Sequence, residues 1–146
     1  RDLPAQAAAA LGERPDLVVV LVGANDATHA ARLSGVRRDL GSAVRSLTAA
    51  GVPVVVATAP DLGAARSFDQ PLRTVLAWEG RRVAAAEAGA VTRAGGLVVP
   101  LGRLTGPTFR ADPSTLSRDR FHPSDHGYDV WATAIEPVVL RAARPR

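Results

Sequence analysis

The chain has 146 residues, 47% hydrophobic and 22% charged, so one globular domain with a real apolar core is expected over residues 1–146. Its formal charge of +4 includes 18 basic residues, all arginine and scattered along the chain, which argues against a nucleic-acid groove. No apolar run approaches the roughly 20 residues of a membrane span, and the lack of cysteine excludes disulfides while leaving the compartment undecided.

Helices and strands are expected to alternate along the chain. Continuous apolar runs rich in valine predict buried strands, because a strand covered on both faces needs no polar side. Apolar residues at three- and four-residue spacing predict the helices, and glycines or prolines end them. The expected order is a helix over residues 3–11, a strand at 17–22, a helix over 33–47, a strand at 52–58, a helix over 71–94, a strand at 97–101 and a last helix that includes residues 128–139.

This order predicts an α/β fold with a parallel sheet, right-handed crossovers and helices on both faces. Ligands of such sheets bind at the carboxyl ends of the strands. Here those ends are residues 23–29, residues 58–63 and the segment after residue 101. Residues 102–124 are expected to form one long loop, and loops of that length in a domain are usually functional.

Asp119 and His122 lie in the stretch "DRFHPSDHGY" before the last helix. Their spacing on a turn lets the carboxylate accept a hydrogen bond from one ring nitrogen, which leaves the other nitrogen available as a general base. Ser124 or Asp125 can cap the helix that follows. An isolated Asp-x-x-His is nevertheless a weak signal.

The stretch "GAND" ends the strand at 17–22 with Gly23, Asn25 and Asp26. The glycine allows another segment or a substrate to approach closely, and the asparagine amide can donate to a developing oxyanion. Asp26 can brace the loop through backbone hydrogen bonds. Taken alone, Asn-Asp after a strand is ordinary turn chemistry.

In this order the two motifs are more specific, and the chain resembles the SGNH (GDSL-type) hydrolase superfamily along essentially its whole length. "GAND" matches the family's Gly-x-Asn-Asp block, and "DRFHP" matches its Asp-x-x-His-Pro block. The resemblance implies a three-layer, flavodoxin-like α/β/α fold, ester hydrolysis without a cofactor or metal, and an ester substrate. It assigns Asn25 to the oxyanion hole, His122 to general base and acid catalysis, Asp119 to orienting His122, and Gly23 and Asp26 to shaping the site.

The Gly-Asp-Ser nucleophile block and the second-block glycine of this family are absent from the chain. Serines at positions 34, 42 and 46 fall in or beside a helix, those at 114 and 117 fall in the long loop, and Ser124 is too close to His122 in sequence. Ser67 is at a strand end but lacks the nucleophile turn. We therefore expect an upstream segment to supply the serine and the first two strands, and to cover an apolar sheet edge that would otherwise be bare.

Two other classes of function stay open from the residues. A metal-dependent hydrolase would use hard or borderline ligands from Asp26, His29, Asp119, His122 and His126. A non-catalytic α/β module would need no serine. Insensitivity to chelators would count against the first class, and a Gly-Asp-Ser encoded upstream would count against the second.

Overall fold

Three parallel strands form the centre of the molecule in a computed structural model that describes residues 2–29 and 31–144. They are β1 (Val18–Leu21), β2 (Val54–Ala57) and β3 (Leu97–Val99), in the sheet order β1-β2-β3. Val18 pairs with Val54, and Val55 pairs with Leu97. The strands lie within the three predicted apolar runs, and the second begins directly after Pro53, a residue that cannot donate to a ladder.

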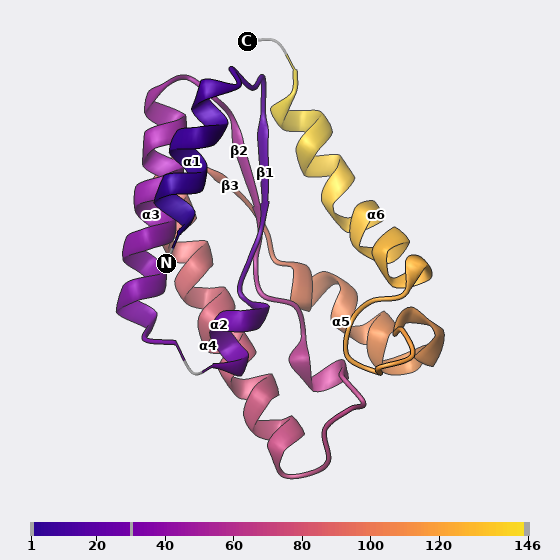
Figure 1. Cartoon of the computed structure of the whole chain (residues 1–146). Helices are drawn as coiled ribbons and strands as arrows, with labels where there is room; N and C mark the ends of the chain where they lie inside the picture. The colour runs from indigo at the N-terminus through magenta and orange to yellow at the C-terminus, as the bar shows by residue number, and fades with distance from the viewer. Residues whose placement is uncertain (1, 30, 145–146) are drawn as a thin grey trace.

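Helices cover both faces of this sheet (Figure 1). The first, third and fourth helices pack on one face, and the last helix packs on the other, which confirms the predicted three-layer α/β/α arrangement. None of the described helices is long and apolar enough to cross a bilayer. The helices are α1 (Leu3–Gly12), α2 (Ala24–Thr28), α3 (Leu33–Ala49), α4 (Leu72–Arg93), α5 (Leu101–Ala111) and α6 (Asp125–Ala142), with short 3-10 turns η1 (Leu62–Ala64) and η2 (Pro113–Thr115).

The central strand β2 supplies both halves of the core, since its side chains alternate between the faces. Val54 and Val56 pack with α1, α3 and α4, whereas Val55 and Ala57 pack with α6. All four residues of β2 are fully buried or nearly so. A strand covered on both faces was predicted from the apolar run, and β2 confirms it.

β1 differs from that prediction because it lies at the edge of the sheet. Its side chains alternate between half-buried and exposed, with Val19 40% and Leu21 50% exposed. The two exposed side chains face away from the α1–α3 layer, and no other described strand pairs with the outer edge of β1. An apolar strand edge of this kind is a template for pairing with another segment.

The prediction of one long loop over residues 102–124 is wrong for its first half. The structure has α5 and then η2 there. Gly102 and Gly106 disfavour a helix in isolation, so the local signal was misleading. In the structure these glycines let α5 lie against the segment that follows β2. A Cβ added at Gly102 would be 2.8 Å from the backbone nitrogen of Asp61, and a Cβ added at Gly106 would be 2.8 Å from Oδ2 of Asp61. Burial of Phe109 on the same helix adds to this packing.

The three strands end at one edge of the sheet and lead into α2, η1 and α5 respectively. The turn over residues 116–124 folds back to this same region, at the lower end of the view in Figure 1. The carboxyl edge of the sheet therefore carries both motifs that the sequence singled out.

Candidate active site

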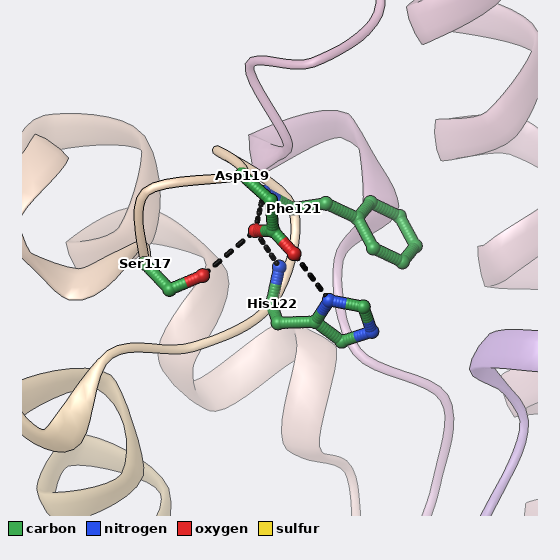
Figure 2. A network of polar contacts seen from close by, with 4 residues as sticks. All are labelled: Ser117, Asp119, Phe121 and His122. Carbon is green, nitrogen blue, oxygen red and sulfur yellow. Dashed lines mark hydrogen bonds and ion pairs between the residues drawn. The ribbon is translucent and has the colours of Figure 1, made fainter.

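Asp119 and His122 face each other in the turn before α6, as Figure 2 shows. Nδ1 of His122 lies 2.6 Å from Oδ2 of Asp119. The other carboxylate oxygen, Oδ1, accepts three hydrogen bonds: from the Ser117 hydroxyl at 2.7 Å, from the Phe121 backbone N–H at 2.9 Å and from the His122 backbone N–H at 3.0 Å. The carboxylate is thus held from several sides while it contacts the imidazole.

Backbone hydrogen bonds close this turn. Leu116 and Pro123 form an isolated antiparallel bridge, and the Ser117 N–H donates to the His122 carbonyl at 2.8 Å. Ser124 then caps α6, because its hydroxyl accepts from the Gly127 N–H. The same hydroxyl donates to the Ser114 carbonyl at 2.6 Å, which joins the turn to η2. The predicted serine cap is confirmed, and it fixes where the turn ends and the helix begins.

The hydrogen bond with His122, followed by those from Ser117 and the two backbone amides, holds the pKa of Asp119 well below its usual range. The carboxylate is therefore ionised at neutral pH and can accept a hydrogen bond from the Nδ1–H group of the imidazole. No described side chain hydrogen-bonds to Nε2 of His122, whose side chain is 67% exposed. The pair leaves one ring nitrogen open at the surface.

Two aromatic rings support the imidazole from one side. Phe121 contacts His122 edge-on, with ring centroids 4.9 Å apart, and Phe68 packs edge-on against Phe121 at 5.6 Å. Phe68 belongs to the segment that follows η1, whose Arg66 N–H donates to the Arg120 carbonyl at 2.8 Å. The turn with His122 is therefore attached to the segment that follows η1.

The segment "GAND" forms a helical turn, so the turn-or-loop expectation for residues 23–26 is wrong in detail. Gly23 has φ +101° and caps α2, which holds Asn25 in its first turn. Ala27, on the opposite side of α2, is buried against Ala59 and Val83. Asn25 is exposed, and its side-chain amide makes no hydrogen bond with any described residue.

A side chain at position 23 would have no room. An ideal Cβ there would lie 2.5 Å from Oε1 of Glu87, 2.6 Å from Cβ of Ala59 and 2.8 Å from Cα of Ala59. The positive φ is a second penalty for any residue other than glycine. Both observations agree with the close approach predicted for this position.

Gly23→Ala tests this close approach, with Gly51→Ala as a matched control. Gly51 also has a positive φ, +80°, but nothing lies within 4 Å of an added Cβ. We expect Gly51→Ala to lower the free energy of unfolding by about 1 kcal/mol, the cost of placing alanine in the left-handed backbone conformation. Gly23→Ala should lower it by about 3 kcal/mol or more, because the added Cβ also clashes with its neighbours. Urea denaturation of both variants measures the difference, and equal losses would show that the site can open without cost.

Asn25 and His122 line two adjoining hollows. A broad open cleft of about 890 Å³ includes Asn25 and Asp26, and a smaller cavity of about 70 Å³ includes His122. Ala24, Pro60 and Trp131 line both. The two motifs thus lie on either side of a shared wall, close to each other but without direct contact.

Asp26 lies in the same cleft, yet its carboxylate makes none of the hydrogen bonds expected for bracing the loop, at least with the residues that the structure describes. Of the five residues of the metal alternative, Asp119 and His122 contact each other, whereas the other two histidines have different partners. Nδ1 of His29 lies 2.9 Å from the Asn25 carbonyl oxygen, and Nε2 of His126 lies 3.4 Å from Oδ2 of Asp112. Across residues 2–29 and 31–144, no three His, Asp or Glu side chains gather as metal ligands.

The serines do not meet the imidazole. Ser117 and Ser124 are engaged with Asp119 and with the Ser114 carbonyl, and Ser67 is exposed on the segment after η1. No serine hydroxyl of the described chain hydrogen-bonds to His122. Among residues 2–29 and 31–144, the candidate site therefore combines a histidine, its carboxylate partner and an amide, and no serine hydroxyl contacts the imidazole.

Glu87 on α4 lines the same cleft as Asn25, and the sequence pattern did not single it out. It is fully buried, and its Oε2 accepts a hydrogen bond from the Ala59 N–H at 2.8 Å. Its Oε1 has no partner among the described residues. Burial raises the pKa of Glu87 to about 7, partly offset by the Ala59 hydrogen bond, and the charge of Asp26 adds to the rise.

A signal for Glu87 was present in the helical spacing. Val83 and Ala90 were predicted to face inward, and Glu87 lies between them at positions i+4 and i−3 of the same stripe. A carboxyl group on an inward stripe is uncommon, because a buried charge is costly unless it is paired. A glutamate on an inward stripe therefore indicates a specific contact in the core.

The family model described as GDSL-like Lipase/Acylhydrolase family matches residues 1–130. The chain is 43% identical over 126 residues to the GDSL-like esterase Rv1075c of Mycobacterium tuberculosis, covering 86% of this chain and 40% of that protein. The chain therefore spans less than half the length of this curated relative.

Two crystal structures show the same fold. Both are catalytic mutants of Axe2, an acetylxylan esterase from Geobacillus stearothermophilus, and both are 19% identical to this chain. One matches with a TM-score of 0.71 over 100% of this chain and 68% of its own, and the other with 0.68 over 93% and 65%. The predicted fold class is thereby confirmed.

Proposed function

Because this chain belongs to the GDSL-like lipase/acylhydrolase family, we propose that it forms the histidine, carboxylate and amide part of a serine esterase site. The observation that carries the proposal is the 2.6 Å contact between His122 Nδ1 and Asp119 Oδ2, while Nε2 has no hydrogen-bond partner among the described residues. An imidazole held in this tautomer is a general base. The reaction is the hydrolysis of a carboxylic ester.

In the proposed reaction, a serine hydroxyl attacks the ester carbonyl while Nε2 of His122 takes its proton. The ionised Asp119 stabilises the resulting imidazolium and keeps the ring in place. The tetrahedral intermediate then loses its alcohol, which receives the proton from His122, and an acyl-enzyme remains. Water attacks this acyl-enzyme while His122 takes a proton from it, and His122 then returns that proton to the serine oxygen as the carboxylic acid leaves.

Asn25 is the proposed side-chain donor of the oxyanion hole. Its amide is exposed in the cleft and makes no competing hydrogen bond with described residues. It lies on a helix that Gly23 and Ala27 hold against the core, so the donor is carried by ordered backbone. A donor that is placed before the reaction stabilises developing charge without reorganisation.

The nucleophile would come from a segment outside these 146 residues. The outer backbone edge of β1, which pairs with no described strand, and the broad cleft beside it offer a place for such a segment to pair and to deliver a hydroxyl between Asn25 and His122. We propose that a further parallel strand pairs with β1. This arrangement would bury Val19 and Leu21, which are now partly exposed.

The test uses the full-length gene product and short-chain aryl esters. We expect ester hydrolysis, covalent labelling of one serine outside residues 1–146 by an organophosphonate fluoride, and no loss of rate in EDTA. Peptide mapping of the labelled enzyme identifies the serine. Labelling within this chain, or loss of activity in EDTA, would contradict the proposal.

A further inference from the structure

The carboxyl group of Glu87 lies beneath the corner where β1 and β2 end. Oε2 accepts from the Ala59 N–H, directly after β2 and Thr58. Oε1 occupies the space next to Gly23, 2.5 Å from where a Cβ would be. One side chain of α4 therefore contacts the ends of two strands at the carboxyl edge of the sheet.

The position of α2 depends on such contacts because it is only five residues long. A helix this short has no stability of its own in water. It is attached at Gly23, which lies against Glu87, and at Ala27, which packs with Val83 one turn earlier on α4. Asn25 lies between these two points of attachment.

We propose that Glu87 is a positioning residue for Asn25: its buried carboxyl group holds the Gly23 corner against the end of β2 and so places the Asn25 amide in the cleft. This inference rests on the proposed function, since it assumes that the amide receives an oxyanion. Glu87 itself touches no reacting atom. Its role is to set the geometry of a group that does.

The charge on Glu87 matters to the same corner. The charge of Asp26 on α2 acts on the Glu87 carboxyl group, which also accepts a hydrogen bond from the Ala59 N–H. The cleft is also lined by four other charged residues: Asp2, Arg32, Arg38 and Asp39. A neutral Glu87 carboxyl group does not repel the negative charge that develops on the oxyanion. As pH rises through about 7, ionisation of Glu87 adds a negative charge beneath the corner, so activity is expected to fall on the alkaline side.

The test compares Glu87→Gln, Glu87→Leu and the control Glu79→Gln in the full-length protein. Glu79 is on the same helix but pairs with the exposed Arg82. We expect Glu87→Leu to lower kcat by about 10- to 100-fold with KM within about threefold, the pattern of a lost transition-state interaction. Glu87→Gln should keep kcat within about threefold of wild type and lose the alkaline fall, because glutamine keeps the acceptor and cannot ionise.

Backbone amide shifts of Gly23 and Asn25, measured by NMR, give a readout that does not depend on activity. They should move in Glu87→Leu and stay in place in Glu79→Gln. Unchanged amide shifts together with an unchanged kcat in Glu87→Leu would overturn the inference. If that variant does not fold, a Glu87→Gln variant whose activity still falls at alkaline pH as in wild type would overturn it. A wild-type protein that hydrolyses no ester would instead refute the proposed function, and the shifts would still test the hold on Gly23.

Discussion

Replacing His122 with alanine in the full-length protein is expected to lower kcat for aryl ester hydrolysis by about 10³-fold or more. The physical reason is the loss of the only described group that can take the serine proton and return it to the leaving alcohol. Asp119 cannot substitute, because its pKa is held below the usual range and it stays ionised. The fold should survive, since the His122 side chain is exposed.

His126→Ala is the matched control for this variant. His126 lies in the first turn of α6, four residues after His122, is also exposed, and has its Nε2 3.4 Å from Oδ2 of Asp112. Its removal should change kcat by less than about twofold, because it has no part in the proposed proton transfers. Steady-state kinetics of both variants, with circular dichroism to check the fold, make the comparison; equal losses would contradict the role of His122.

Asn25→Ala is expected to lower kcat by about 10²- to 10³-fold with little change in KM, as removal of a preorganised oxyanion donor does in hydrolases. The interaction exists only when charge develops on the carbonyl oxygen, so substrate binding in the ground state is not expected to weaken. Asn25→Asp should lose at least as much, because it replaces a donor with a negative charge at the same place.

Ser34→Ala controls for a general effect of changing the cleft. Ser34 lines the same cleft from the start of α3, and its hydroxyl has no hydrogen bond with a described residue. We expect kcat within about twofold of wild type. A tenfold or greater rise in KM for Asn25→Ala with kcat unchanged would instead assign Asn25 to substrate binding, and the oxyanion assignment would be wrong.

Much of the fold was predictable because its signals are local. The valine-rich runs at residues 17–22, 52–58 and 97–101 contain all three strands, and the Asp-x-x-His spacing brought Asp119 and His122 into contact on one turn. Both are properties of a few consecutive residues, where backbone geometry alone limits what can form. The SGNH resemblance was likewise carried by short blocks.

Other features depend on contacts between distant segments. α5 forms despite Gly102 and Gly106, since its close packing on Asp61 outweighs their poor helix propensity. α2 forms because Ala27 is buried against α4, a contact that no local pattern encodes.

The amino-acid sequence therefore specified the strand runs, the helix stripes and the histidine-carboxylate turn, which all follow from short-range spacing. The folded chain alone revealed that Glu87 meets the Gly23 corner across 64 positions of sequence (87 − 23), and that Asn25 and His122 line hollows with a common wall. Such proximities arise from the packing of helices on the sheet. The burial of apolar surface is non-directional, so it determines which distant residues become neighbours only when the whole core assembles.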